Sequence, residues 1–238
     1  VIDAGMTFIG PQPQWLRRMG DKVSARALLS EHGFPVFAGS GLIEDLALAG
    51  AVADDIGYPV IVKPSGGGGG MGMVVVDDAA HLEDAIKRAQ AVATQAFATT
   101  GVYLERFITR PRHIEYQILG DGRGGAIHLY ERECSVQRRN QKLIEESPAP
   151  GLDPLLIQQR ADMAAAVCAD LGYDNVGTLE TLFASNGDMG FLEMNTRIQV
   201  EHGVTEAITG CDLIQLQIEL AQGGELPDDR AYLDGCST

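Results

Sequence analysis

The sequence has few cysteines and few positive charges. Four cysteines occur in 238 residues, and 18 lysines and arginines stand against 33 acidic residues. Disulfide frameworks and zinc sites use closely paired cysteines, whereas Cys134, Cys168, Cys211 and Cys236 are widely scattered. We therefore expect reduced thiols, no zinc site and a cytoplasmic protein.

The acidic balance also limits the partners. A net charge of −15 at pH 7 disfavours nucleic acid and anionic membrane surfaces, because both are themselves negative. A local basic pocket would still admit an anionic substrate. We expect no membrane span and no signal peptide, since the sequence lacks a sufficiently long apolar run. The 45% hydrophobic residues are enough for a globular protein with a sizeable core.

The most informative pattern is a predicted β-hairpin. Two strand-like runs, Val176–Phe183 and Met189–Asn195, flank Asn186-Gly187, a dipeptide typical of a hairpin turn. A turn centred there pairs Glu180 with Glu193, and directly opposed residues share one face of a sheet. The register therefore places two carboxylates side by side.

Adjacent carboxylates repel each other unless something positive lies between them. Mg2+ is commonly held by one or two carboxylates, with substrate phosphates completing its shell. Thr178 is predicted to lie opposite Asn195 on the same face, with Leu182 and Phe191 flanking the pair. The pattern favours a metal site, and a solvated strand face with two unrelated acids is the alternative.

A polar cluster follows the second strand directly. Arg197, Gln199, Glu201 and His202 lie within six residues, at a strand end where functional side chains often gather. An arginine can hold a planar anion with two parallel hydrogen bonds, and a nearby glutamate can act as a base. The alternative is an ordinary exposed ion pair.

A glycine-rich loop, Gly66–Gly70, separates two further predicted strands, Tyr58–Pro64 and Met73–Val76. Neither a helix nor a Gly-Lys-Ser/Thr sequence follows the loop, so it matches neither a dinucleotide fingerprint nor a Walker loop. Exposed N–H groups at a hairpin tip can close over phosphates. Lys63, at the end of the first strand, is placed to contact the same phosphates. A flexible linker is the alternative.

Helical patterns surround these strands. Asp21 is predicted to cap a helix that ends at His32, and Lys22 in its first turn is disfavoured by the helix dipole. That lysine is either directed at an anion or an ordinary surface residue. Further helices are expected over residues 44–56, from Asp77 or Asp78 to Phe97, and over residues 154–171 and 212–222. We therefore expect strands and helices together, in an α+β protein.

A second hairpin is expected at Arg112–Leu119 and Ala126–Glu133. His113, Glu115 and Gln117 alternate with apolar residues there, so one face is polar and the other belongs to the core. The next segment, Ser135–Glu146, concentrates positive charge in an otherwise acidic chain. Its basic residues include Arg138, Arg139 and Lys142.

Together these motifs resemble biotin carboxylase, the ATP-grasp component of biotin-dependent acyl-CoA and pyruvate carboxylases. The segments that carry the resemblance are Lys63 with Gly66–Gly70, Arg112–Gly124, Glu131–Lys142 and Phe191–His202. The resemblance implies an ATP-grasp fold in which two subdomains with mainly antiparallel sheets clamp ATP. The expected divisions are a linker region over 1–34, a smaller lid subdomain over 35–107 and a larger subdomain over 108–238.

The resemblance also implies a reaction. Similar enzymes use ATP, Mg2+ (or Mn2+) and bicarbonate to make carboxyphosphate, and then carboxylate biotin on a carrier protein. The implied partners are a biotin carboxyl carrier and a carboxyltransferase, and the parent enzyme is expected to be a homo-oligomer.

By position, the resemblance assigns roles to residues. The implied metal ligands are Glu180 and Glu193, with Asn195 nearby. The implied catalytic residues are Glu201 as the base, Arg197 on bicarbonate and Lys142 beside it. Ligand-binding roles fall on Lys22, Lys63, Gly67, Gly68, Gly69, Gly70, Met73, Glu105, Ile108, His113, Gln137, Leu182, Gln199 and Val200.

The chain departs from the family pattern at four positions. Met71 and Val74 replace usual basic residues in and after the glycine loop, Asn140 replaces a usual histidine, and Gly203 a usual proline. We also expect the chain to be a fragment, with most of the family's N-terminal domain and its C-terminal region outside it. The alternatives are another ATP-grasp ligase, such as half of a carbamoyl-phosphate synthase, and a non-catalytic nucleotide-binding module.

Overall fold

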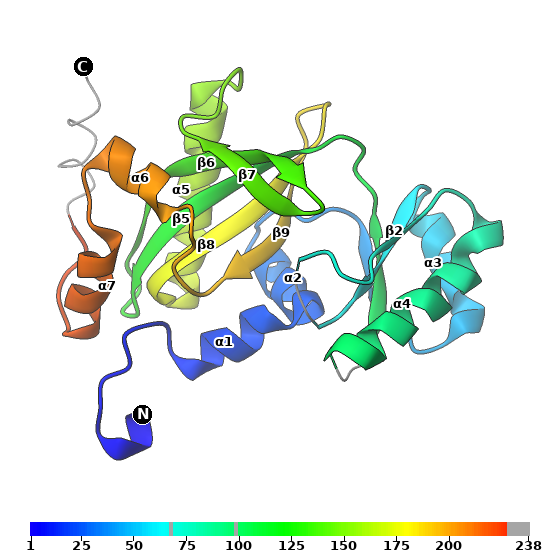
Figure 1. Ribbon diagram of the computed structural model, residues 1–238, viewed down its shortest axis with the longest axis horizontal. Helices are drawn as coiled ribbons and strands as arrows, with labels where there is room; N and C mark the ends of the chain where they lie inside the picture. Colours follow the sequence, from blue (N-terminus) through cyan, green and yellow to red (C-terminus); the bar gives the residue numbers. More distant parts are fainter. Residues whose placement is uncertain (67–68, 98–99, 228–238) are drawn as a thin grey trace.

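A computed structural model describes residues 1–66, 69–97 and 100–227 of the chain. Two antiparallel sheets, each with its own helices, lie side by side along the long axis of the molecule (Figure 1). Within the described ranges, no helix is long and apolar enough to cross a membrane.

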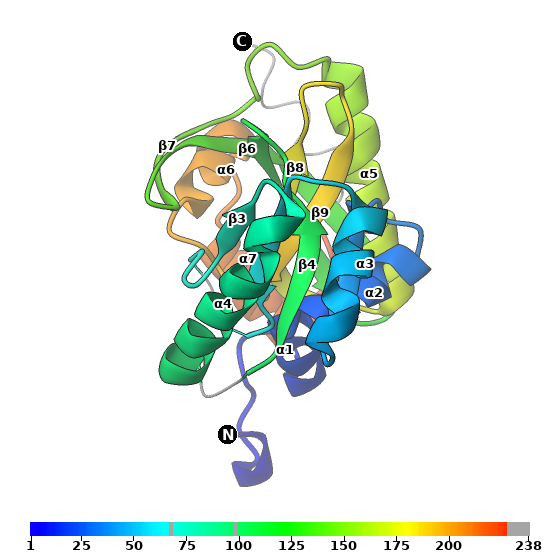
Figure 2. The same cartoon turned by 90° about the vertical axis from the view of Figure 1, so that its right-hand side faces the viewer.

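The smaller sheet has strand order β1-β4-β2-β3. Its strands are β1 (Gly39–Leu42), β2 (Val60–Pro64), β3 (Val74–Val76) and β4 (Val102–Arg106). The helices α3 (Leu46–Ile56) and α4 (Leu82–Phe97) pack together on it, and Figure 2 shows them from the side of this sheet. Apolar residues of both helices, such as Ala53 and Ile86, pack against Val60 and Leu104 of the sheet. The predicted strand–glycine loop–strand hairpin is present, because β2 pairs antiparallel with β3.

The larger sheet has strand order β7-β6-β5-β8-β9. Its strands are β5 (Arg112–Asp121), β6 (Ala126–Arg138), β7 (Gln141–Glu146), β8 (Asp174–Phe183) and β9 (Met189–Asn195). One face packs on α5 (Pro154–Leu171), which begins after the cap Asp153 and ends at Gly172 in a left-handed conformation. Both features are standard helix boundaries.

Four shorter helices complete the fold. They are α1 (Pro13–Gly20), α2 (Lys22–Glu31), α6 (His202–Thr209) and α7 (Leu213–Ala221), and short 3-10 turns lie at Ile2–Ala4 and Ala79–His81. Asp21 caps α2 and Asp212 caps α7, each by accepting a backbone N–H. The sequence patterns did not indicate α1, α6 or β1. For α1 a signal was available, since Pro13 at its first position favours a helix start.

The predicted register of the β8–β9 hairpin is confirmed at its functional end. Thr178 pairs with Asn195 and Glu180 with Glu193. Nearer the turn, Thr181 pairs with Phe191, so β9 has one extra residue, Leu192, at this point. Such a bulge changes which residues share a face.

The bulge overturns one expectation. Phe191 does not flank the glutamates, because it points to the opposite face and lies buried in the core against α2 and its flanking segment, 1% exposed. Leu192 takes its predicted place and lines the cavity described below, together with Leu182.

A close backbone approach in the larger sheet gives a first testable prediction. A Cβ added at Gly120 would lie 2.1 Å from the carbonyl oxygen of Tyr173, which is backbone and cannot rotate away. Gly120→Ala should therefore lower the free energy of unfolding by about 1–3 kcal/mol, as overpacking commonly does. Urea unfolding measures this change.

Gly50→Ala is the matched control for this prediction. Gly50 lies inside α3, and a Cβ there meets nothing within 4 Å. Alanine should stabilise the helix by about 0.5–1 kcal/mol. Equal effects of the two substitutions would contradict the steric argument.

Candidate functional site

A cavity of about 630 Å3 is lined by residues of both sheets. Every described residue to which the resemblance assigns a role lines it, although these residues are spread from position 22 to position 201. They are Lys22, Lys63, Gly69, Gly70, Met73, Glu105, Ile108, His113, Gln137, Lys142, Glu180, Leu182, Glu193, Asn195, Arg197, Gln199, Val200 and Glu201. Gly67 and Gly68 lie outside the described residues.

A row of charged side chains crosses the larger sheet at the cavity. Arg132 of β6 is opposite Glu115 of β5, Glu115 is opposite Glu180 of β8, and Glu180 is opposite Glu193 of β9. Neighbours in such a row lie on one face of the sheet. Three adjacent acids therefore require positive charge close by, and the structure supplies it from both sides of the row.

Lys142 of β7 provides part of that charge. Its ammonium contacts Glu115, lies 2.8 Å from Glu180 and lies 2.6 Å from Glu201. One cation thus joins two carboxylates of the sheet to one from the loop before α6. The side chain of Lys142 is 15% exposed, so these interactions are only weakly screened by water.

These contacts, and one from His113 described below, change the pKa values of Glu180, Lys142 and Glu201. Burial raises the pKa of Glu180, but His113 and Lys142 outweigh it and bring that pKa from 4.5 down to about 2. Burial lowers the pKa of Lys142, yet the charges of Glu115 and Glu180 raise it well above its usual value. The pKa of Glu201 is lowered, because its hydrogen bond with Lys142 outweighs its burial. All three groups are therefore charged near neutral pH.

His113 approaches Glu180 from the neighbouring strand, with 3.0 Å between its Nε2 and a carboxylate oxygen. The side-chain amide of Gln137 lies 2.9 Å from the other ring nitrogen and donates to the carbonyl oxygen of Cys134. This arrangement fits a proton on Nε2, facing Glu180.

Glu193 has a different partner. Lys22, in the first turn of α2, lies 2.8 Å from its carboxylate. The unfavourable position of Lys22 in its helix is therefore offset by a nearby anion, and the expectation that its charge is directed at one is consistent with this contact.

Arg197 and Glu201 do not form an ion pair in the part of the chain that the structure describes. The guanidinium donates to Asn195 at 3.2 Å and to the backbone oxygen of Ile198, and Glu201 turns to Lys142. Arg197 is exposed, and it lines the same cavity. Its side chain therefore remains available to an anion that enters from solvent.

The other part of the cavity is apolar and is lined by residues of both sheets and of the segment that follows β4. Ile61, Phe107, Ile108, Leu182 and Leu192 line it. At its floor the buried carboxylate of Glu105 contacts both Lys63 and Arg26. Arg26, from α2, also donates to the carbonyl oxygen of Phe37 at 2.7 Å, so one buried arginine ties α2 to the smaller sheet.

The glycine loop meets the β6–β7 turn at the edge of the cavity. A Cβ added at Gly70 would lie 2.2 Å from the amide of Asn140. Asn140 has a left-handed backbone, with φ at 63°, which asparagine tolerates better than most residues. Met71 is exposed, whereas Val74 packs against the core of the smaller sheet.

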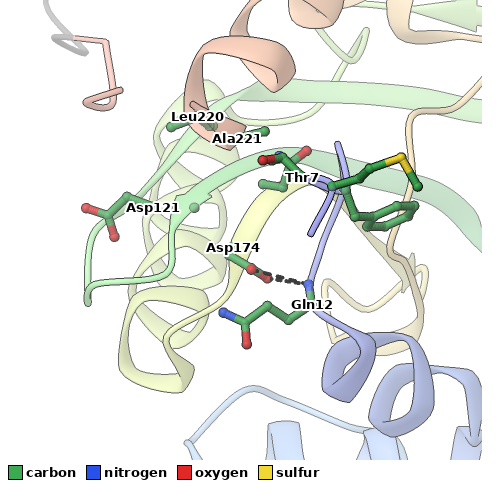
Figure 3. Close-up of a pocket in the computed structure, with 11 residues that line it drawn as sticks. Thr7, Gln12, Asp121, Asp174, Leu220 and Ala221 are labelled. Carbon is green, nitrogen blue, oxygen red and sulfur yellow. Dashed lines mark hydrogen bonds between the residues drawn. The ribbon is translucent and has the colours of Figure 1, made fainter. Parts of the chain in front are cut away.

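A second cavity, of about 340 Å3, lies elsewhere, between the N-terminal segment, the β5–β6 turn region and α7 (Figure 3). The backbone N–H of Gln12 donates to Asp174 there at 3.0 Å. None of the residues that the sequence singled out lines it. It is therefore separate from the candidate site.

Two antiparallel sheets that enclose a cavity lined by lysines and carboxylates define the ATP-grasp class, as the sequence predicted. The chain belongs to the family described as "Carbamoyl-phosphate synthase L chain, ATP binding domain", whose model matches residues 21–229.

Known proteins agree with this assignment. The chain is 48% identical to a biotin carboxylase of Pseudomonas aeruginosa over 94% of this chain and 50% of that protein. A complex of the Campylobacter jejuni biotin carboxylase with β,γ-ATP superimposes with a TM-score of 0.94 at 43% identity, over 97% of this chain and 52% of that one. The biotin carboxylase domain of the Hydrogenobacter thermophilus 2-oxoglutarate carboxylase, solved with MgADP, ADP and bicarbonate, gives 0.92 at 41% identity, over 95% and 50%.

The resemblance to biotin carboxylase is thus confirmed. The chain spans about half the length of the curated relatives it matches.

Sequence reasoning missed three residues that shape the site. Glu115 was assigned only to a polar strand face, while Arg132 and Arg26 were given no role. The pairing of β5 with β8 and β6 would have placed the first two in the charged row. For Arg26, the signal was an arginine on the apolar face of α2, between the buried residues Ala25 and Leu29.

Proposed function

We propose that this chain is the ATP-binding core of a biotin carboxylase. It would use ATP and bicarbonate to form carboxyphosphate and then carboxylate carrier-bound biotin, as a ligase that forms a C–N bond. The observation that carries this proposal is Lys142 held among three carboxylates, within a cavity that Arg197 and Gln199 also line. That arrangement combines anion binding with an ionised base.

The donor set fits Mg2+ or Mn2+. Glu180 and Glu193 are opposed across two strands, and the amide of Asn195 donates to Glu180 at 2.9 Å. Oxygen ligands of this kind are those that hard divalent cations prefer. The metal would be held by Glu180 and Glu193, with Asn195 nearby, and would neutralise the phosphate charge when bound.

The chain's own residues would act on the substrates as follows. Lys22 and Lys63 would turn from Glu193 and Glu105 toward phosphates, since each is now paired with a carboxylate that a bound nucleotide would compete with. Arg197, Gln199 and the backbone of Val200 would hold bicarbonate, beside Lys142. Glu201 would accept its proton, because its lowered pKa keeps the carboxylate ionised near neutral pH.

The apolar part of the cavity suits a purine. Leu182 would pack on the face of the adenine, Glu105 and Ile108 would bracket its edge, and His113 and Gln137 would reach the ribose. Gly69, Gly70 and Met73 would approach the phosphates from the hairpin tip, as would Gly67 and Gly68. Backbone N–H groups of a glycine loop suit this task.

The remaining inferences concern the whole protein. We infer a biotin carboxyl carrier and a carboxyltransferase as partners, because a pyruvate carboxylase subunit of Methanothermobacter thermautotrophicus is 48% identical to this chain. The relative from Hydrogenobacter thermophilus is described as a dimer, which supports a homo-oligomeric parent enzyme. Cys134, Cys168 and Cys211 form no disulfide within the described residues, which supports a cytoplasmic setting.

The test is ATP hydrolysis by this chain with Mg2+, in the presence and absence of bicarbonate and then with free biotin. Stimulation by bicarbonate, with a further response to biotin, is the expected result. A response to bicarbonate but none to biotin would favour the carbamoyl-phosphate synthase alternative. ATP binding without stimulation would favour a nucleotide-binding module and would contradict the proposal.

Glu201→Gln separates the base from nucleotide binding. The amide cannot accept the proton, so bicarbonate-stimulated turnover should fall by about 100-fold or more, while ATP affinity stays within about twofold because Glu201 does not line the apolar part. Glu206→Gln, one turn along α6, is the control and should have no effect on stimulation. Strong residual stimulation in Glu201→Gln would show that another group is the base.

A further inference from the structure

Arg132 lies behind the cavity wall, in β6, and has none of the roles proposed above. It is fully buried and does not line the cavity. A guanidinium has five N–H donors and stays charged at any physiological pH. Burying one is costly unless its donors find acceptors. The partners of those donors therefore indicate what Arg132 does.

All five donors are used, and each goes to a different side chain. The acceptors, all buried, are Glu115, Gln117, Thr178, Gln199 and Thr205. They come from two neighbouring strands, the loop after β9 and the helix α6. One side chain thus connects four separate segments, which a lysine with a single nitrogen could not do in the same geometry.

Two of these acceptors make a second contact with a residue that lines the cavity. The oxygen of the Gln199 amide accepts from Arg132 at 3.1 Å, so its nitrogen faces Glu180 and donates at 2.8 Å. One oxygen of Glu115 accepts from Arg132 at 2.7 Å, and the other contacts Lys142. Arg132 therefore sets the orientation of the Gln199 amide, which lines the cavity, and of the buried Glu115 carboxylate, which contacts Lys142.

A third acceptor, Thr205, lies in the helix that follows Glu201. Arg132 donates to the hydroxyl of Thr205 at 2.7 Å, and Thr205 lies in α6, which starts directly after Glu201. The 2.6 Å contact between Glu201 and Lys142 depends on where this helix begins. Arg132 therefore helps to position both partners of that contact. It holds Glu201 through Thr205 in α6 and Lys142 through Glu115.

We propose that Arg132 is the positioning residue of the anion-binding end of the cavity, which fixes Gln199, Lys142 and Glu201 relative to one another without touching substrate. The identity of the anion as bicarbonate rests on the proposed function. Residues that orient the groups in direct contact with a ligand commonly matter as much as those groups themselves.

The test is Arg132→Lys, which keeps the buried charge beside Glu115 but cannot supply five donors. We expect the KM for bicarbonate to rise by about 10- to 100-fold, as loss of such supporting contacts does elsewhere, while the KM for MgATP stays within about twofold. Arg123→Lys, an exposed arginine in the turn before β6, is the matched control and should leave both constants unchanged. A bicarbonate KM within twofold of wild type, or an equal rise in both constants, would overturn the proposal.

A crystal structure of Arg132→Lys provides a readout that does not need activity. The proposal expects the Gln199 amide to leave Glu180 and the Glu201–Lys142 contact to lengthen. Unchanged positions of these groups would overturn the proposal for Arg132, whatever the activity of the wild-type chain. A lack of bicarbonate stimulation in the wild-type chain would count against the proposed function and not against the role of Arg132. If Arg132→Lys does not fold, Thr205→Val removes only one acceptor and should still raise the bicarbonate KM selectively; no rise would overturn the proposal.

Discussion

Glu193→Gln should reduce Mg2+-dependent ATP turnover by about 100- to 1,000-fold, the usual effect of removing one electrostatic partner of a reacting phosphate. The amide keeps the shape of the side chain but loses the charge that a divalent cation requires. The fold should be retained, because Glu193 lies at the cavity surface with its side chain 26% exposed.

The measurement has two parts. Turnover is followed with Mg2+ in excess, and the Kd for ATP is determined with and without the metal. Wild type should bind ATP more tightly when Mg2+ is present, and Glu193→Gln should lose that difference. Glu219→Gln, on α7 and outside the cavity lining, is the control. Near-normal turnover in Glu193→Gln would show that Glu193 is not a metal ligand.

Lys142→Met should lower the free energy of unfolding at pH 7 by about 3–5 kcal/mol, because it leaves buried carboxylates without their shared cation. Lys142 contacts Glu115, Glu180 and Glu201 at once. Methionine preserves much of the side-chain volume, so the loss of stability would come from the missing charge and not from a cavity. Bicarbonate-stimulated turnover should also be lost.

The pH dependence of this loss has a definite sign. The pKa of Glu180 falls from 4.5 to about 2 on folding, so its ionised form stabilises the fold fully above pH 4.5, and that stabilisation is lost as the pH falls toward 2. Lys142 is one cause of the shift. The difference between wild type and Lys142→Met should therefore be largest near neutral pH and should shrink below pH 4.5.

Urea unfolding at pH 7 and pH 3.5 measures this difference. Lys87→Met is the control, because its pair with Glu83 lies on the exposed surface of α4, where ion pairs contribute little. A stability difference that is equal at both pH values would show that Lys142 acts through packing and not through the carboxylates.

Features of the site that depend on residues close together in the sequence could be predicted, whereas features that depend on contacts between distant segments could not. The Glu180–Glu193 pair could be predicted because a local turn signal brings the two strands close to the right register. Next to the turn Phe183 pairs with Met189, one residue off the predicted register, and the bulge at Leu192 restores it. The resemblance implied the α+β, ATP-grasp fold class, and both the pairing and the fold class are confirmed. The individual roles of the site residues and the domain boundaries remain predictions.

The unpredicted features depend on contacts between distant segments. The charged row needs the pairing of β5 with β8, about 60 residues along the chain (Glu115 with Glu180), and no turn signal specifies it. Arg132 has a sequence neighbourhood of ordinary polar residues, and only the folded sheet brings its five acceptors together. The bulge at Leu192 has no sequence signature of its own, because an apolar residue there fits either register.

The bulge at Leu192 changes which side chains of β9 face the core and which face the cavity, and the two ends of the strand need opposite arrangements. Near the turn, Met189 and Phe191 must face the core that anchors the hairpin. In a regular strand Glu193 would share the face of Phe191 and enter the same core. The extra residue reverses the alternation, so Glu193 and Asn195 face the cavity instead. The bulge therefore matters more than the identity of Leu192: a substitution there alters one cavity contact, and its deletion would leave a regular strand with Glu193 still opposite Glu180. A regular strand that kept Leu192 would instead turn the acid into the apolar interior.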